Sequence, residues 1–371
     1  MIQIPFTRST IRNIAPEYLK KALAGERFEL IELLEAKVGE SINAPYVIAV
    51  SNPTLAIHLA LSALDMKRGD RMIASVNAHP AAGLMIRQFD AEPIFVDIDP
   101  DVFNMSLDDL ADKLATNRHK KTRGIFCTLI AGQAAYTDKI FALAKEHKVL
   151  CLIECCGSLG AIKIKDGAPD MLVTSVYPID GYFGANVGFI ATTNKEFSDR
   201  ARLIRNHGFS TEYSGDKIYD YDVVELGYDF RPSAVDAAYM LSVSPIYTTA
   251  KHRRFDIAKK YDKAFADLSH LKTPVVQGDH MYTAYIVKID KNRDSFARSL
   301  AERGIETKLN FVPLHMMSYY RAKYSLKLNK FPCALSNYQH ILSLPIYADL
   351  KESEVKHIID SVREIDQSRT W

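Results

Sequence analysis

The sequence lacks the segments that mark a membrane-bound or exported protein. No apolar run approaches the ~20 residues that a membrane-spanning helix requires. The start of the chain, Met1 to Phe6, has no basic region followed by an apolar core, as a secretory signal would have. There are only five cysteines, and this odd count favours a reducing compartment over a disulfide framework. We therefore expect a cytoplasmic protein with no membrane partner.

An excess of charge of one sign is also missing. Lys and Arg together number 47 and Asp and Glu 45, so no strongly basic surface is expected to attract nucleic acid. Cys151, Cys155 and Cys156 lie close together, but no second ligand pair follows at the spacing of a zinc site. We therefore expect neither a nucleic-acid partner nor a bound metal ion.

Apolar strand-like runs alternate with helical segments through the first half of the chain. Strands are expected at 46–50, 71–75, 93–98, 124–130, 149–154 and 171–174. Because these runs are apolar throughout, they favour a mostly parallel sheet covered by helices on both faces, an α/β architecture. The 371 residues allow a large domain at 1–240 and a smaller C-terminal α+β domain at 241–371. A helix from about Ser233 to Tyr261 is expected to break at Pro245.

Polar residues follow or end several of these strands. Asn52 and His79 come just after two of them, Glu154 ends a third, and Asp180 lies in a loop between apolar runs at 171–174 and 187–192. In parallel sheets, ligands bind beyond the carboxyl ends of the strands, so these four residues are candidates for a functional site. Asp180 precedes Gly181, and a simple turn is the alternative interpretation of that pair.

The segment Ser51-Asn52-Pro53-Thr54 joins a strand to a helix. Such a turn can bind an anion, because the first N–H groups of the helix point outward. Ser or Asn is expected to cap this helix. Pro53 removes one donor, although proline in the first turn of a helix is also favourable for purely structural reasons.

Several blocks resemble the sugar-nucleotide aminotransferases of the DegT/StrS family. Residues 51–61 are similar to that family's Ser-Gly-Thr-Ala-Ala-Leu-His-Leu-Ala-Leu motif, and Pro93-Ile94-Phe95-Val96-Asp97-Ile98-Asp99-Pro100 matches a family block almost letter for letter. Further blocks follow in the family's order at 205–208, 227–231, 312–315 and 344–347. The resemblance implies a fold-type I architecture for pyridoxal phosphate (PLP) and a homodimer with its active sites at the subunit interface.

The resemblance breaks at the residue that carries the family's covalent chemistry. The family's Ser-Phe-x-Pro-x-Lys block corresponds to residues 175–180, which places Asp180 at the position of the Schiff-base lysine. A carboxylate cannot form an imine with an aldehyde, so covalent attachment of PLP at this position is excluded. As an acid or base, aspartate would replace that lysine only in part.

Other positions implied by the resemblance also differ. Glu154 stands where the family has the Asp that pairs with the pyridinium nitrogen, and His79 where an aromatic residue stacks on the ring. Pro53 replaces a glycine of the phosphate turn, and Asp229 replaces an Asn that reaches the neighbouring subunit's phosphate, placing like charges together. The remaining implied contacts of this vestigial PLP pocket come from Asn52, Thr54 and the retained Ser175, while Gly157 opens space beside the ring. We expect no cofactor, or PLP or pyridoxamine phosphate (PMP) held only noncovalently.

Three hypotheses remain open from the sequence. The first is a PLP-independent enzyme that modifies a nucleotide sugar by epimerisation, isomerisation or dehydration, with Asp180, Glu154 and His79 as catalytic candidates. The second is a non-catalytic partner, either a nucleotide-sugar-binding subunit or one half of a heteromer with an active paralogue. The third is a PMP-dependent sugar dehydratase. Ordinary transamination is the least favoured activity. Candidates for binding the sugar are His315, Tyr182, Tyr213 and Tyr219.

Overall fold

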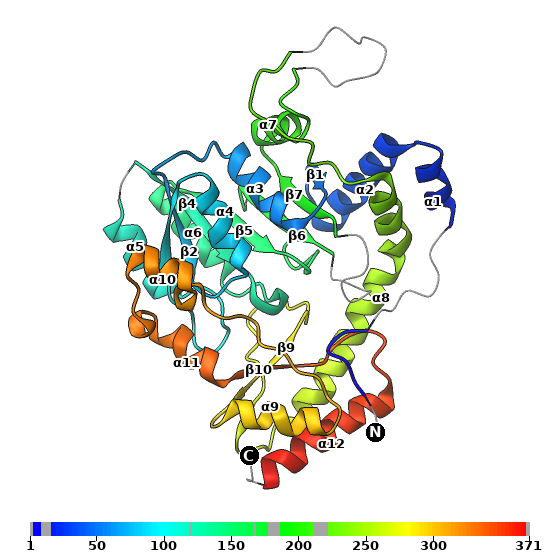
Figure 1. The fold of residues 1–371 in the computed structure, drawn as a ribbon, viewed down its shortest axis with the longest axis vertical. Helices are drawn as coiled ribbons and strands as arrows, with labels where there is room; N and C mark the ends of the chain where they lie inside the picture. Colours follow the sequence, from blue (N-terminus) through cyan, green and yellow to red (C-terminus); the bar gives the residue numbers. More distant parts are fainter. Residues whose placement is uncertain are drawn as a thin grey trace.

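Two β-sheets organise the part of the chain that the structure describes. The computed structural model describes residues 3–8, 16–118, 120–165, 168–176, 186–210 and 222–368. Within these ranges, one sheet has seven strands and the other has three. Figure 1 shows the larger sheet beside the helices of the N-terminal part and the smaller sheet among the C-terminal helices.

The larger sheet is mostly parallel, as the sequence predicts. Its order is β1-β7-β6-β5-β4-β2-β3, and only β7 runs antiparallel to its neighbours. The carboxyl ends of all the other strands therefore meet at one edge. The strands are β1 (Tyr46–Val50), β2 (Arg71–Ser75), β3 (Glu92–Val96), β4 (Thr122–Thr128), β5 (Leu150–Cys155), β6 (Met171–Ser175) and β7 (Gly188–Thr192).

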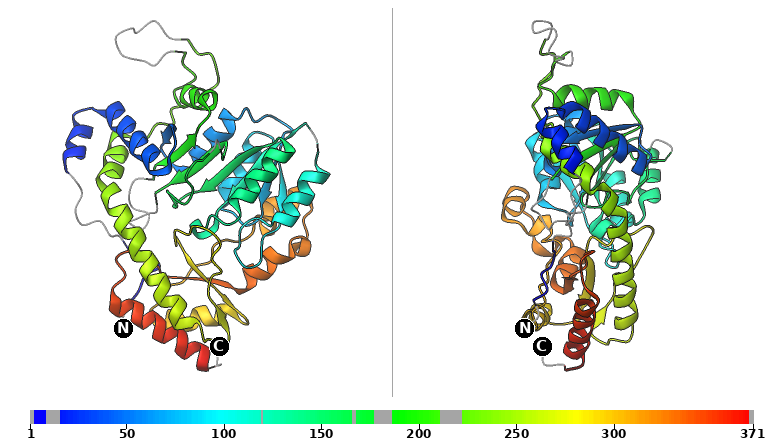
Figure 2. Two further views of the ribbon diagram at one scale, coloured as in Figure 1. Left: turned by 180° about the vertical axis from the view of Figure 1, so that it is seen from behind. Right: turned by 90° about the vertical axis from the view of Figure 1, so that its right-hand side faces the viewer.

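Helices cover both faces of this sheet, which confirms the predicted fold class. One apolar cluster packs α3 (Pro53–Ala63), α4 (Pro80–Gln88) and α7 (Lys195–Arg205) on one face. A second cluster packs α2 (Arg27–Ile42), α5 (Leu107–Thr116) and α6 (Thr137–His147) on the other. Alternate residues of each strand belong to the two clusters, for example Ile48 and Val47 of β1, because successive strand side chains point to opposite faces. Figure 2 shows these layers from two further directions.

The smaller sheet is antiparallel and has its own apolar cluster. It contains β8 (Leu271–Lys272), β9 (Tyr285–Ile289) and β10 (Ile341–Leu344), in the order β10-β9-β8. Helices α9 (Arg293–Glu302) and α12 (Glu352–Ser368) contribute to the cluster. The N-terminal segment joins this part of the molecule, because Ile4 forms a parallel bridge with Ile305 and contributes to the same cluster.

One long helix, α8 (Ala234–Phe265), connects the two sheets (Figure 1). It starts in the core beneath the larger sheet and ends in the cluster of the smaller one. The predicted break at Pro245 is wrong, because the helix continues through that residue. Proline lacks the N–H that would bond the carbonyl of Leu241, but the Ser244 hydroxyl donates to that carbonyl at 2.9 Å. The Leu241 carbonyl therefore keeps a hydrogen-bond partner, and the helix continues past Pro245.

A second connection passes over the other side of the larger sheet. We call residues 311–334 the strap; it contains α10 (Ser318–Tyr324) and leads into α11 (Pro332–His340). The Leu314 N–H donates to the Val76 carbonyl at 2.7 Å, just beyond β2. Beyond β3, the Asp97 carboxylate accepts from the backbone N–H groups of Cys333 and Ala334 at 3.0 and 2.9 Å. The strap thereby attaches the C-terminal part to the edge where β2 and β3 end.

Candidate functional site

Four of the predicted site residues lie at the edge of the larger sheet where its parallel strands end. Asn52 follows β1, His79 follows β2, Glu154 is the penultimate residue of β5, and Ser175 ends β6. These strands all run in one direction, so the four residues lie at the same edge, with Ser175 and Glu154 on adjacent strands and Asn52 and His79 to either side of them. Glu154 and Ser175 are buried, with exposed fractions of 5% and 6%, whereas His79 is exposed.

The turn after β1 forms the start of α3, as predicted. The Asn52 side chain caps the helix by accepting from the Leu55 N–H at 2.9 Å. The Ala56 N–H donates to the Asn52 carbonyl, and Pro53 has no N–H to offer. Among the contacts between described residues, this leaves the Thr54 N–H as the first-turn donor available to an anion.

Glu154 and Ser175 hold the loop that follows β5. Glu154 Oε1 accepts from the Cys156 N–H at 2.8 Å, and Ser175 Oγ accepts from the Gly157 N–H at 2.7 Å. A hydroxyl that accepts one hydrogen bond can still donate its own proton, and the Ser175 hydroxyl is within hydrogen-bond reach of the Cys156 thiol. Burial, reinforced by the Glu154 charge, raises the pKa of Cys155 to about 12, so this thiol is protonated and poorly nucleophilic.

His79 caps α4 through its own ring. Nδ1 accepts from the Ala81 N–H at 3.2 Å, so a neutral His79 carries its proton on Nε2. The ring meets Phe311 of the strap edge-on, with the centroids 5.8 Å apart. A neutral His79 can therefore donate a hydrogen bond through Nε2 while the aromatic face of Phe311 limits its movement.

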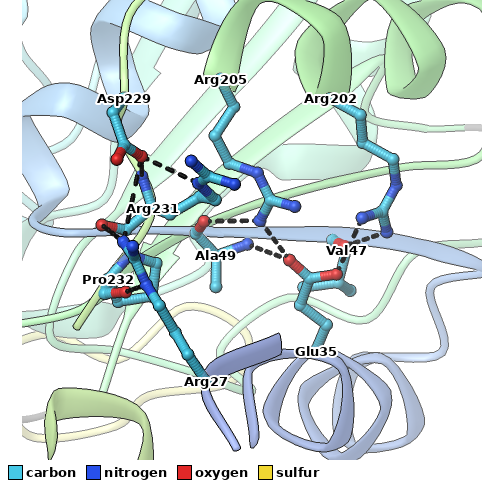
Figure 3. A network of polar contacts seen from close by, with 9 residues as sticks. All are labelled: Arg27, Glu35, Val47, Ala49, Arg202, Arg205, Asp229, Arg231 and Pro232. Carbon is cyan, nitrogen blue, oxygen red and sulfur yellow. Dashed lines mark hydrogen bonds and ion pairs between the residues drawn. The ribbon is translucent and has the colours of Figure 1, made fainter. Parts of the chain in front are cut away.

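Asp229 does not stand as an isolated negative charge. Its Oδ1 accepts from Arg231 Nε at 2.8 Å and lies 3.9 Å from Arg27 Nη2 (Figure 3). Partial burial raises the pKa of Asp229, but the hydrogen bond and charge of Arg231 outweigh it and lower the pKa below its usual value. The positive charges of the two guanidinium groups thus outweigh the negative charge of the carboxylate. The resemblance to the family did not reveal this pairing.

His315 is enclosed at the beginning of the strap. Its side chain is fully buried, Nε2 lies 3.0 Å from the Leu328 carbonyl, and the ring packs 4.9 Å from that of Phe331. Burial lowers its pKa, so it is neutral near pH 7 and donates from Nε2. The other predicted residues, Asp180, Tyr182, Tyr213 and Tyr219, lie outside the described residues.

Sequence reasoning missed a charged network close to the Asn52 turn. Figure 3 shows Arg202 and Arg205 reaching from α7 to Glu35 on α2, beside β1. Nothing in the local sequence distinguishes Glu35 from the solvent-facing acids of the same helix; a buried carboxylate becomes evident only when the helices are packed. Among the described residues, no group of three His, Cys, Asp or Glu side chains is arranged to hold a metal ion. In the same part of the chain, no helix has the length and apolar character needed to cross a bilayer.

Comparison with known proteins identifies the family. Residues 11–363 match the model of the DegT/DnrJ/EryC1/StrS aminotransferase family. The chain belongs to this family. The spore coat polysaccharide biosynthesis protein SpsC of Bacillus subtilis is 27% identical over 350 residues, covering 90% of this chain and 89% of SpsC.

Solved structures of other aminotransferases share the fold. The aminotransferase TlmJ from Streptoalloteichus hindustanus superposes with a TM-score of 0.87 at 22% identity, covering 100% of both chains. Spr1654 from Streptococcus pneumoniae, described as a sugar aminotransferase, has a TM-score of 0.87 at 20% identity in its PMP-form, covering 99% of this chain and 100% of Spr1654. Spr1654 is also known in a PLP-form.

These comparisons correct one prediction from the sequence. We expected no cofactor, on the basis of weakened phosphate contacts and the residue at the lysine position. Membership of an aminotransferase family, together with PLP- and PMP-forms of a protein of the same fold, shows that this expectation is wrong. Asp229 was expected to repel a phosphate with its uncompensated charge, whereas it is paired with Arg231 and adjacent to Arg27.

Proposed function

We propose that this protein is a PMP-dependent enzyme that modifies the sugar of a nucleotide sugar, by dehydration or isomerisation. Family membership supports sugar chemistry with a PLP-type cofactor. The observation that carries the proposal is the gathering of Thr54, Ser175 and Glu154 at one edge of the sheet. These three residues offer two hydrogen-bond donors and a buried carboxylate, which suit the two ends of such a cofactor.

The phosphate end of the cofactor would lie against the start of α3. The N–H of Thr54, for which the described residues provide no acceptor, and the hydroxyl of Ser175 are donors suited to a phosphate oxygen. Arg231 and Arg27 offset the charge of Asp229, so repulsion of a phosphate by this carboxylate is weaker than the sequence implies.

The ring end would meet Glu154. A buried carboxylate favours a positively charged partner, and a protonated pyridine nitrogen supplies one. When bound, PMP supplies an amino group and an electron-accepting ring. His79, whose Nε2 carries the proton in the neutral form, would donate a hydrogen bond beside the ring rather than accept a proton from the sugar.

Asp180 is the proposed acid–base residue. The sequence contains no lysine between Lys165 and Lys195, so no amine of this segment is available to hold PLP or to transfer protons. PMP carries its own amino group, so no lysine of the protein is needed to hold it covalently. We propose that the Asp180 carboxylate takes a proton from the sugar carbon and returns it to a neighbouring atom.

Cofactor binding tests the site. Wild-type protein, Glu154→Gln and the surface control Glu146→Gln are titrated with PMP and followed by absorbance. Saturable binding by wild type and by the control is expected, with a loss of about tenfold or more in Glu154→Gln, which removes a charge-assisted hydrogen bond. No saturable binding of PMP by the wild type would refute the proposal.

The lysine position has its own test. Protein incubated with PLP is treated with borohydride, and the adduct is mapped by mass spectrometry of peptides. No adduct is expected in the segment 176–187 of the wild type, whereas Asp180→Lys should acquire one there. A wild-type adduct on another lysine in the site would show that this residue takes over the role and would contradict the assignment of Asp180.

The substrate class is tested with UDP-, GDP- and dTDP-sugars in the presence of PMP. At least one is expected to raise the melting temperature, because ligands that bind only the folded state stabilise it. The product is then identified by mass: dehydration removes a water, isomerisation leaves the mass unchanged, and amination of the sugar would show a transaminase instead. Nucleotide-sugar binding without conversion would favour a non-catalytic partner.

A further inference from the structure

The free edge of β1 is completed by side chains instead of by another strand. Among the strands of the described residues, β1 pairs only with β7, so alternate residues turn their N–H and C=O groups away from the sheet. The Ala49 N–H donates to Glu35 Oε1 at 2.8 Å, and the Ala49 carbonyl accepts from Arg205 Nη1 at 2.9 Å. The Val47 carbonyl accepts from Arg202 Nη2 at 2.9 Å. These three side chains therefore take the place of a neighbouring strand.

The three charged groups also bind one another (Figure 3). Glu35 lies 2.6 Å from Arg205 Nη1 and 3.0 Å from Arg202 Nη1. The exposed fractions of the side chains are 6% for Glu35 and 9% for Arg205, but 34% for Arg202. Geometry matters in such a buried group, because a carboxylate that loses its partners in a low-dielectric interior is strongly unfavourable.

The same residues lead directly into the turn proposed to bind phosphate. The Ser51 N–H donates to the Phe230 carbonyl at 2.8 Å, and the Phe230 N–H donates to the Arg205 carbonyl at 3.2 Å. From the opposite side, a Cβ at Gly188 would lie 2.7 Å from the Asn52 carbonyl oxygen, so β7 packs against the turn without space to spare. The turn is therefore confined between β7 and the segment that Arg205 supports.

We propose that Glu35, Arg202 and Arg205 are positioning residues for the Ser51–Thr54 turn. By fixing the free edge of β1, they set the direction in which the Thr54 N–H points at the start of α3. Pro53 makes this direction decisive, because it leaves one first-turn donor where a glycine would have left two. The proposal rests on the proposed function in one respect, namely that this turn holds a cofactor's phosphate.

A comparison of PMP with pyridoxamine tests the proposal, because only PMP carries the phosphate. Dissociation constants for both are measured with wild type, Glu35→Gln and Arg202→Gln. The matched control is Glu354→Gln in the C-terminal part, another buried carboxylate, whose two oxygens accept from Arg8 at 2.7 and 3.1 Å. It tests whether losing any buried ion pair has the same effect.

Glu35→Gln is expected to weaken PMP binding about tenfold and to leave pyridoxamine binding unchanged. The more exposed Arg202→Gln is expected to weaken PMP binding about threefold, and it provides the test if Glu35→Gln does not fold. Glu354→Gln is expected to lower the melting temperature without changing the preference for PMP over pyridoxamine.

An unchanged preference for PMP in folded Glu35→Gln or Arg202→Gln would overturn the proposal. So would an equal loss of affinity for both compounds, since that would indicate general destabilisation. If the wild type itself binds PMP no more tightly than pyridoxamine, the phosphate site of the proposed function fails, and this inference fails with it. That result differs from the first two, in which the wild type discriminates.

Discussion

Two strand-to-helix turns at the same edge of the large sheet are built alike but anchored differently. Both helices begin with a proline, and both are capped by a side chain that accepts a backbone N–H, Asn52 before α3 and His79 before α4. The first turn follows an edge strand whose free side is closed by Glu35 and two arginines. The second turn is held by the strap, through the Leu314 N–H and the ring of Phe311.

Charged residues therefore hold one turn of the site in place, and packing contacts hold the other. The first turn depends on a buried ionic network formed by residues that precede α8. The second depends on the C-terminal strap, whose contacts near α4 are mainly aromatic and apolar. Removing a charge should therefore disturb mainly the first turn, whereas overpacking between α4 and the strap should act on the second.

The largest effect is expected from removing Arg205. Arg205→Met leaves Glu35 buried with one guanidinium and removes the donor to the Ala49 carbonyl. We expect the free energy of unfolding to fall by about 3–5 kcal/mol, measured by urea denaturation. Arg202→Met, at a more exposed position, should lower it by at most about 1 kcal/mol. Similar losses in both variants would contradict the distinction between them.

Acid should weaken the C-terminal part, which contains two buried neutral histidines. Burial lowers the pKa of His280 to about 4 and also lowers the pKa of His315. Between pH 6.5 and 4, the unfolded chain binds the His280 proton and the folded chain does not, so stability falls as the pH falls. From pH 7 to 5, His280 alone should account for a loss of about 2 kcal/mol. His280→Gln should show a smaller decrease in urea denaturation across this range; an unchanged slope would contradict the assignment.

Overpacking tests the contact between the strap and α4. A Cβ at Gly83 would lie 2.9 Å from Cζ of the buried Tyr320, and it would be closer than van der Waals contact to the Tyr320 hydroxyl and to Leu314. Gly83→Ala should therefore lower the free energy of unfolding by about 1–2 kcal/mol, despite alanine's better helix propensity.

The double variant Gly83→Ala/Tyr320→Phe provides the control. The Tyr320 hydroxyl is buried and has no hydrogen-bond partner among the described residues, so removing it should cost little. Part of the loss should then be recovered in the double variant. Additive effects of the two substitutions would show that the clash is not with this hydroxyl.

The smallest effect is expected at the cap of α3. Asn52→Ala removes the acceptor for the Leu55 N–H and should lower the free energy of unfolding by about 1 kcal/mol. Asn52→Asp keeps an acceptor at the same position and should retain most of that stability. Thermal denaturation of both variants makes the comparison, and equal losses would show that the cap contributes little.

Features that depend on neighbouring residues were predictable from the sequence. The cap at Asn52 follows from residue type and spacing, and its side chain accepts from the first turn of α3. The mostly parallel sheet follows from apolar runs separated by helices. The break at Pro245 was the wrong inference, because the Ser244 hydroxyl supplies the bond that proline removes.

Features that depend on distant pairing were not predictable. Glu35 pairs with Arg205, 170 residues later in the chain. Asp229, which follows the last strand of the large sheet, lies beside Arg27, which precedes the first. A single sequence gives no sign of such pairs, although the close spacing of Asp229 and Arg231 permitted their local contact. The site positions of Asp180, Tyr182, Tyr213 and Tyr219 remain predictions.

The course of α8 has a consequence for cutting the protein into fragments. At 1.5 Å per residue, its 32 residues span about 48 Å, and a cut at residue 240 would fall inside its first turns. The C-terminal fragment would also lose Ile4, which bridges Ile305, and Arg8, which pairs with Glu354. A fragment starting at Ala234 would keep the whole helix but would expose the apolar face that α8 buries against the larger sheet. Co-expression of both pieces, rather than isolation of either, is therefore the practical route to a split form of this protein.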